Sequence, residues 1–231
     1  MFGNNNAAAL LHPDNHTIIN AQPLYRCTPG SPVLSLVMGK DRAKDDIVSS
    51  NGTYGAHGGS ELSSIDGTIR LGELLPDALP IQHALKLQLN AGDYYYNKRP
   101  GYAWSALNCD GGNDIYLSPG SLLAIPSNVT VNVTTTPAKK LLFALQNYGA
   151  YIVADTVANH GTLNTEHGVT DEFQAAYGYD FDSGPTGPGA EWYADMLALF
   201  QALHVVINNS ESTVGGGGTP LQPPPPPICP I

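Results

Sequence analysis

The chain has 231 residues, which fits one large domain and is long enough to bury a core without metals or disulfides. Hydrophobic residues make up 42% of it, so its composition is not that of a disordered chain. Ten Lys and Arg stand against twenty Asp and Glu, and the resulting net charge of −10 excludes nucleic acids, whose phosphates attract clustered basic residues. No apolar run approaches the ~20 residues of a membrane-spanning helix, so we expect no membrane insertion.

Composition divides the chain into three regions. Residues 1–16 are rich in Asn and Ala, which is typical of a loose N-terminal arm. Residues 17–210 carry the alternating and helical hydrophobic patterns of a folded domain. Residues 211–231 contain four consecutive glycines, which predict a hinge, and then a proline run, which predicts a stiff polyproline II tail.

Six short stretches of the domain have the pattern of β-strands: residues 17–22, 81–89, 121–125, 128–134, 151–157 and 204–207. The clearest is 81–89, because Leu85, Leu87 and Leu89 alternate with other residues over its second half. Residues 39–53 are polar and charged and predict a loop. Three glycines within residues 54–60 predict a tight turn or a close approach to another chain segment.

Two stretches have the apolar periodicity of helices, residues 137–148 and residues 190–203. The first has Thr136 as its candidate N-cap, Pro137 at the position where no N–H is needed, and Gly149 as a left-handed C-cap. Short strands, Gly/Pro-rich loops and about two helices favour a mainly β fold. We expect a jelly-roll-like β-sandwich decorated with these helices and flanked by extended termini.

Five N-x-[ST] sequons start at Asn15, Asn51, Asn128, Asn132 and Asn208, against about two expected by chance from the composition. Residues 128–134 alternate strictly between polar and apolar, which predicts a half-buried strand with both of its sequons facing solvent. Because a glycan needs such exposure, we expect covalent N-linked glycans and an extracellular protein.

The three cysteines bear on the compartment as well. Cys27 and Cys109 lie inside the predicted domain and are candidates for a disulfide, which leaves Cys229 in the tail. The alternative is three thiols in a reducing compartment. None of the three belongs to a C-x-x-C motif or a Cys/His cluster, so we expect no zinc site and no other cofactor.

Three stretches are more specific than composition: residues 55–64 (GAHGGSELSS) with 67–74 (GTIRLGEL), residues 81–87 (IQHALKL), and residues 203–209 (LHVVINN) followed by GGGGTP at 215–220. In this order the chain resembles a family of secreted, functionally uncharacterised proteins, many of them bacterial, over roughly residues 17–220. The resemblance implies an extracellular, jelly-roll-like domain and supplies no reaction. The chain departs from the pattern at Glu61 and Asp66, where the family usually has glycine, and at Gln82.

A cluster of ionisable residues in this region offers two interpretations: His57, Glu61, Asp66, Arg70, Glu73 and His83. Carboxylates paired with a histidine are the groups of an acid–base hydrolase or lyase acting on sugars. In the structural interpretation, Arg70 pairs with Glu73 and His83 is a hydrogen-bonded core residue. A third hypothesis is a carbohydrate-binding module whose stacking platform is drawn from Tyr94, Tyr95, Tyr96, Tyr102 and Trp104.

The tail favours a structural role over an enzymatic one. A stiff segment with an apolar tip is suited to docking in an aromatic groove, on its own domain or on a neighbour. An arm or tail laid on the next copy makes a heterologous contact, which generates a fibre when it does not close. We therefore expect an extracellular structural protein whose partner is itself, in a homopolymer such as a filament. The candidate assembly residues are Pro223, Pro224, Pro225, Pro226, Pro227, Ile228, Cys229 and Ile231.

Overall fold

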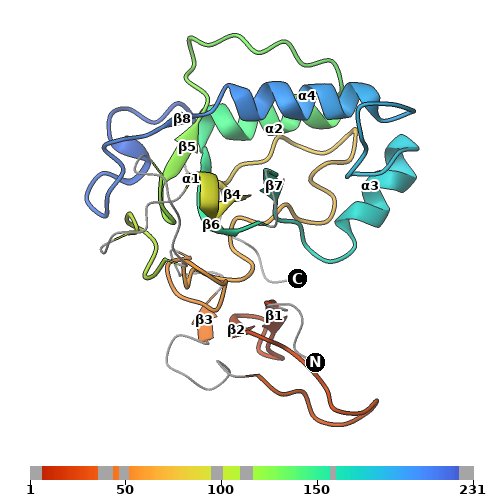
Figure 1. Cartoon of the computed structure of the whole chain (residues 1–231), viewed down its shortest axis with the longest axis vertical. Helices are drawn as coiled ribbons and strands as arrows, with labels where there is room; N and C mark the ends of the chain where they lie inside the picture. Colours follow the sequence, from red (N-terminus) through yellow and green to blue (C-terminus); the bar gives the residue numbers. More distant parts are fainter. Residues whose placement is uncertain are drawn as a thin grey trace.

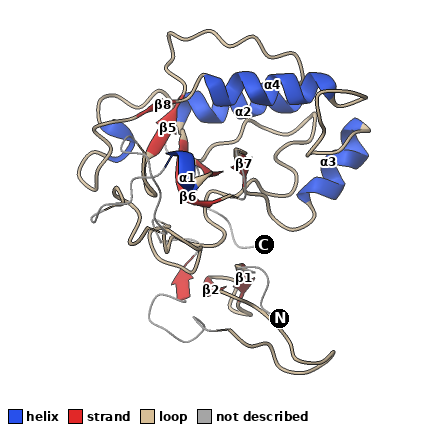
Figure 2. Cartoon of the chain, in the orientation of Figure 1, coloured by secondary structure: helices blue, strands red, loops and turns tan. Residues whose placement is uncertain are grey.

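The computed structural model describes residues 7–35, 44–46, 52–94, 101–109, 117–156 and 160–223. Within these ranges the chain forms two β-sheets and four α-helices, with the larger sheet and the helices in one body and the smaller sheet at one end of it (Figures 1 and 2). None of these helices combines the length and the apolar character that a bilayer crossing requires.

The larger sheet has five strands in the order β7-β4-β6-β5-β8. The strands are β4 (Leu85–Leu89), β5 (Leu122–Ala124), β6 (Ala150–Asp155), β7 (Thr162–Leu163) and β8 (His204–Val205). The central pair, β4 and β6, is parallel, and the other pairings are antiparallel. Both edges of this sheet are therefore strands of only two residues.

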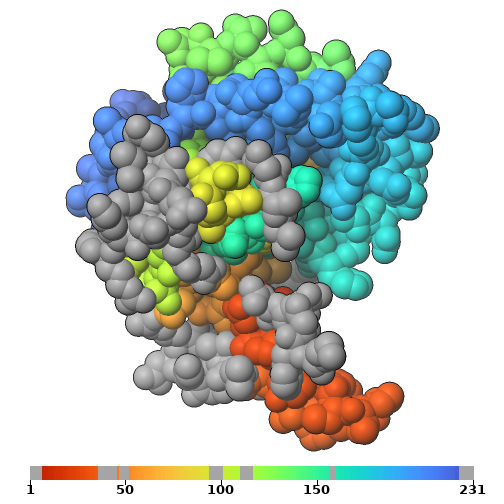
Figure 3. Space-filling view, viewed as in Figure 1, coloured from red at the N-terminus to blue at the C-terminus, as the bar shows by residue number. Residues whose placement is uncertain are grey.

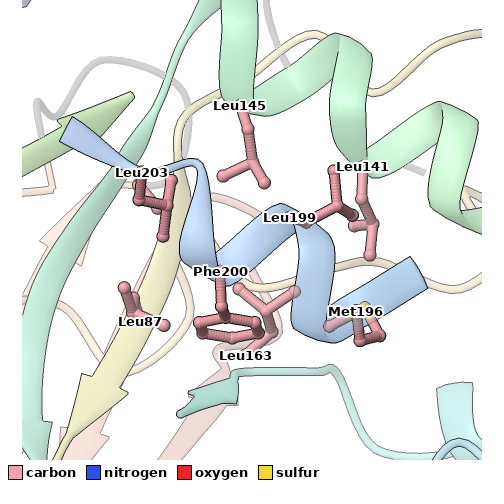
Figure 4. A pocket seen from close by; sticks show the side chains of 9 residues that line it. Leu87, Leu141, Leu145, Leu163, Met196, Leu199, Phe200 and Leu203 are labelled. Carbon is pink, nitrogen blue, oxygen red and sulfur yellow. The ribbon is translucent and has the colours of Figure 1, made fainter. Parts of the chain in front are cut away.

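Helices α2 (Thr136–Asn147) and α4 (Ala190–Gln201) lie side by side over this sheet (Figure 1). Their apolar stripes and the inward residues of the sheet form the main core, because a helix stripe must bury its apolar side chains against a partner. Figure 4 shows Leu141 and Leu145 of α2 facing Leu199 and Phe200 of α4, above Leu87 of β4. The void left between them has a volume of about 10 Å³ and is lined by apolar side chains.

A buried carboxylate joins the two long helices. Asp195 of α4 accepts hydrogen bonds from the backbone N–H of Thr135 at 2.8 Å, from its hydroxyl at 2.7 Å, and from the N–H of Thr134 at 3.1 Å. These donors lie at the N-terminus of α2, where backbone N–H groups have no partner within the helix. The cap of α2 is thus supplied by α4. Two shorter helices, α1 (Ala91–Tyr94) and α3 (Val169–Tyr177), complete the body.

The smaller sheet is antiparallel and has the order β1-β2-β3, with β1 (Ala8–Leu11), β2 (Thr17–Ala21) and β3 (Lys44–Asp46). It lies at the lower end of the molecule, where the N-terminal residues stand out from the body (Figure 3). Asn20 of β2 is fully buried and fastens the sheet to the body by accepting a hydrogen bond from the backbone N–H of Ser64 at 2.6 Å.

Much of the expected element order is present. The structure confirms the two long helices, and a strand overlaps five of the six predicted stretches. Gly149 has a φ of +76° just beyond α2, as a left-handed C-cap requires. Between Asn128 and Thr134 exposure alternates residue by residue as predicted, and the three valines pack against the core. The strand expected there is wrong, because no strand of the described residues pairs with this segment.

Other expectations need correction. Residues 8–11, expected in a loose arm, form β1, and residues 44–46, expected in a loop, form β3. Helices α1 and α3 were not predicted, and α2 begins one residue earlier than expected, with Thr135 at the N-cap. The β content is substantial, but the described helices are at least as extensive as the strands, so the expectation of a mainly β fold is met only in part. The described strands form a mixed sheet with a parallel centre, whereas a jelly roll pairs its strands antiparallel, so the sandwich detail is not confirmed.

Candidate functional site

A glycine-rich loop, residues 52–68, packs directly on β4. Gly55 is required there, because a Cβ at this position would lie 2.4 Å from the Cα of Ser63. Gly67 has a φ of +80° and accepts a hydrogen bond from the N–H of Lys86 through its carbonyl at 2.9 Å. The loop therefore covers the face of β4 that does not point toward the helices.

Lys86 is buried beneath this loop. Strand periodicity directs Leu85 and Leu87 to the main core and Lys86 and Gln88 to the opposite face. The Lys86 ammonium donates to the backbone carbonyl of Ser63 and lies 3.4 Å from His57 Nδ1. Burial lowers the pKa of Lys86 to about 7, although the nearby carboxylate of Asp66 acts in the opposite direction.

His57 continues this line of polar contacts. Its Nε2 lies 3.4 Å from the Gln88 amide, which bonds the side chain of Asn164 at 3.1 Å. Burial and the charge of Lys86 lower the pKa of His57 to about 3, so the imidazole is neutral at physiological pH. The four side chains fasten the glycine-rich loop to the sheet.

A second pair lies at the end of the same region. His83 Nε2 is 3.0 Å from a Glu73 carboxylate oxygen, and His83 Nδ1 is 3.0 Å from the carbonyl of Ala84. Burial pushes the pKa of His83 down, but the hydrogen bond and the charge of Glu73 outweigh it and the pKa is raised. Both ring nitrogens face acceptors, which is the environment of an imidazolium. Glu73 also accepts from the backbone N–H of Arg70 at 2.7 Å.

A groove of about 760 Å³ opens beside these residues. One wall comes from the glycine-rich loop and β4, another from the turn after α2 and from β6, and a third from the chain's own C-terminal segment. Its polar and aromatic lining includes Asp66, His83, Lys86, Trp104, Ser105, Gln146, Asn147, Tyr148, Tyr151, Glu211 and Gln222. A volume of this size is typical of small-molecule and cofactor sites.

The structure brings together part of the cluster singled out in the sequence. Asp66 and His83 line the groove, whereas His57 lies behind Lys86, and Glu61 is directed to Asn108 at 3.4 Å. Glu61 has a φ of +58°, in the left-handed region that favours glycine. The ring nitrogens of His57 and His83 and the ammonium of Lys86 are engaged by groups of the protein itself. The geometry therefore supports a structural role for this cluster better than acid–base catalysis.

Lys86 is the residue that the sequence did not reveal. In an alternating strand it reads as an outward-facing lysine, and only the covering loop buries it. The glycines at 55, 58 and 59 were the available signal, because they indicated a close approach of two chain segments without naming the second.

The remaining predicted residues fall in several places. Asn15, Asn128, Asn132 and Asn208 are exposed, as glycosylation requires, and Asn51 lies outside the described residues. Cys27 is exposed and Cys109 half-buried, both are thiols in the structure, and their disulfide stays a prediction. Of the aromatic candidates, Trp104 lines the groove and Tyr102 is exposed. The side chain of Tyr94, together with Tyr95 and Tyr96, lies outside the described part.

The start of the tail lies against its own domain. Residues 214, 215 and 217–223 line the groove, and the glycine run is held by bonds rather than open. Gly215 N donates to Asn209 at 2.9 Å, and the Asn208 amide donates to Gly216 O. Pro223 is the last described residue, so Pro224, Pro225, Pro226, Pro227, Ile228, Cys229 and Ile231 lie outside the described part.

Across the described ranges, no three potential metal ligands of the His, Cys, Asp or Glu type gather at one point. Comparison of the chain with protein-family models, with curated proteins and with solved structures finds no match. Function must therefore be argued from the geometry alone.

Proposed function

We propose that this chain is an extracellular structural protein that assembles head to tail into a homopolymer, such as a filament. Its N-terminal strand β1 adds to the outer edge of β8 on the next copy. The observation that carries the proposal is a pair of unlike sheet edges on one chain, each with exposed aliphatic side chains. The jelly-roll form expected from the sequence is not needed for this contact and stays a prediction.

The first edge is β1. Its sequence, Ala-Ala-Leu-Leu, has no charge, and Leu11 is 54% exposed. His12 N donates to Thr17 O, and hydrogen-bonded pairs alternate along an antiparallel ladder. Ala9 and Leu11 therefore direct their backbone N–H and C=O groups away from β2. No strand of the described residues pairs with them, so β1 is a template for a further strand.

The second edge is β8. Val206 N donates to Leu122 O, so the neighbouring residue Val205 directs its backbone groups away from β5. Val205 is 40% exposed and Ile207, two residues further on, is 92% exposed. In the described part of the sheet no strand lies beyond β8. This edge offers both backbone hydrogen bonds and apolar surface, the two components of recognition by strand addition.

The two edges are far apart, with β1 at the lower end of the molecule and β8 beside the helices (Figure 1). A contact between unlike surfaces at separate places on one chain is heterologous, and it propagates instead of closing as a two-fold dimer. The opposite edge of the small sheet, β3, reads Lys-Asp-Asp, and such charges oppose edge-to-edge pairing. We favour β1 over the C-terminal tail, residues 211–231, as the assembling segment, because the described start of the tail lies on its own domain.

The test uses one variant at each edge, Leu11→Glu and Ile207→Glu, in the full chain. A charge at either contact should stop assembly, and sedimentation velocity should then show monomers where the wild type forms large species. Leu79→Glu is the matched control, because Leu79 is an 80% exposed leucine of a loop at neither edge, and it should assemble like the wild type. Circular dichroism confirms that each variant is folded.

Mixing the two monomeric variants gives the sharpest result. The Leu11→Glu chain retains an intact β8 edge, and the Ile207→Glu chain retains an intact β1 edge. An equimolar mixture should form one-to-one dimers and nothing larger, because both outer ends of such a dimer are blocked. A mixture that stays monomeric, or a wild type that never assembles, overturns the proposal.

An N-linked glycan would block the contact between β1 and β8 at some sequons and leave it open at others. Asn128 and Asn132 are exposed on the segment before α2, remote from β1. Asn208 follows Ile207 directly, so a glycan there competes with the next subunit. We therefore expect Asn208 to be unmodified in assembled material and glycosylated only in the unassembled form.

A further inference from the structure

We propose that the groove beside the glycine-rich loop is a binding site for an uncharged oligosaccharide. The site adjoins the β8 edge through Val206 but is separate from the proposed contact, because β1 contributes no residue to it and Val205 and Ile207 lie outside its lining. The inference rests on the aromatic and amide lining of the groove, on one buried hydroxyl without a partner, and on the charge of the walls.

Three aromatic residues line the groove. Trp104 precedes β5 in the chain, and Tyr148 and Tyr151 come from the turn after α2 and from β6. Tyr151 is held in place by a bond of its hydroxyl to Asn209 at 3.3 Å, and the Trp104 carbonyl accepts from the same Asn209 side chain at 3.4 Å. One asparagine thus fixes two aromatic residues that line the groove. Rings present apolar faces, which suit the C–H faces of pyranose rings.

Tyr148 carries the most specific signal. Its hydroxyl is buried, and it has no hydrogen-bond partner in the structure. A buried hydroxyl without a partner is destabilising, so native proteins seldom keep one unless a ligand or water completes it. Tyr148 lines the groove, and so do its neighbours Gln146 and Asn147, whose amide N–H groups donate to Val129 O at 3.5 Å and to Phe143 O at 2.7 Å. A phenol and two amide oxygens are groups that sugar hydroxyls bind.

The charged residues that line the groove favour neutral sugars over anionic ones. Asp66 and Glu211 bring carboxylates to the groove, and the whole chain carries a net charge of −10. Lys86 and His83 also line it, but the Lys86 ammonium is bonded to Ser63 O, and the His83 ring nitrogens are engaged by Glu73 and by the carbonyl of Ala84. Carboxylates accept hydrogen bonds from neutral hydroxyls and repel uronic acids, sulfates and phosphates. The volume of about 760 Å³ accommodates an oligosaccharide rather than a single small ion.

The experiment titrates the full chain with neutral hexasaccharides built from glucose, mannose, xylose and N-acetylglucosamine, with hexagalacturonate as the anionic comparison. Binding is followed by calorimetry. At least one neutral hexasaccharide should bind, and hexagalacturonate should not. Binding of none of the neutral probes at millimolar concentration, or binding of hexagalacturonate alone, overturns the proposal.

Tyr148→Phe tests the proposed contact directly because it removes only the hydroxyl. Affinity should fall about 3- to 10-fold, the usual effect of one neutral hydrogen bond, while the melting temperature of the free protein should rise. A tyrosine with only a structural role would not combine a weaker affinity for the sugar with a higher melting temperature of the free protein. Trp104→Ala should abolish binding, and Tyr193→Phe, on the exposed face of α4, should change neither quantity. Unchanged affinity in Tyr148→Phe contradicts the assignment.

Discussion

Replacing Lys86 by Met should flatten the dependence of stability on pH. In the folded chain burial lowers the pKa of Lys86 from 10.5 to about 7. Between these two values the unfolded chain holds a proton that the folded chain has released, so the free energy of unfolding rises with pH. The full difference corresponds to about 5 kcal/mol, and about 3 kcal/mol of it develops between pH 7 and pH 9.5.

The groups around Lys86 set the limits of this window. His57 faces it with a pKa of about 3, so the titration of His57 affects stability between pH 3 and 6.5 and not above. Asp66 and Arg70, the other charges acting on Lys86, raise and lower its pKa respectively. Burial raises the pKa of Tyr148 and Tyr151, and their titration lowers stability only above pH 10. His83, whose pKa is raised above 6.5, and Lys140, whose pKa is lowered by burial from 10.5, also change stability near this interval, so the contribution of Lys86 is the difference in slope between the wild type and Lys86→Met from pH 7 to 9.5.

The assay is urea unfolding at pH 7, 8, 9 and 9.5 for the wild type, Lys86→Met and Lys139→Met. Lys139 is an exposed lysine of α2, so its replacement removes the same charge without changing the buried site. The wild type and Lys139→Met should gain stability over the interval, and Lys86→Met should not. A packing change caused by Met shifts the free energy of unfolding equally at every pH, so it does not alter the slope of that free energy against pH. A wild type with a flat profile, or a Lys86→Met variant that keeps the wild-type slope, would refute the burial of a titrating lysine.

Three further predictions concern the fold and its surface. Asp195→Ala should lower the free energy of unfolding by about 2–4 kcal/mol, because the N–H groups at the start of α2 lose a buried charged acceptor, and urea unfolding measures this. Gly178→Ala should lower the free energy of unfolding by about 1 kcal/mol, because Gly178 has a left-handed φ of +76° and no atom crowds its Cβ position. Gly149 has the same φ, but a Cβ there would lie 2.5 Å from a backbone oxygen of β5, so Gly149→Ala should lower the free energy of unfolding clearly more in the same assay. Intact-mass and peptide mass spectrometry of protein from its source should find glycans at Asn128 or Asn132, and the absence of both would contradict the extracellular interpretation.

The sequence predicted the elements whose pattern is local. The 3.6-residue stripe and the glycine C-cap of α2 lie within one segment, and so does the alternation in β4. It did not predict which strands pair. The parallel contact of β4 with β6 joins residues some sixty positions apart, and no local pattern distinguishes it from the antiparallel pairs of a sandwich.

The candidate site shows the same division. His57, Asp66 and His83 could be singled out because ionisable residues near glycines are visible in the sequence. Their roles depend on long-range contacts: Lys86 is buried because residues 52–68 cover it, and the groove exists because the C-terminal segment returns to the sheet. The exposed edges of β1 and β8 likewise follow from pairing, since an unpaired strand cannot be recognised before its neighbours are known.

Electron microscopy of the protein taken directly from its source tests head-to-tail assembly most directly. Strand addition from β1 to β8 predicts ordered polymers with one subunit per repeat, in which the N-terminal sheet of each copy reaches the helical end of the next. Isolated monomers of 24.4 kDa plus any glycans, or closed two-fold dimers, would contradict it.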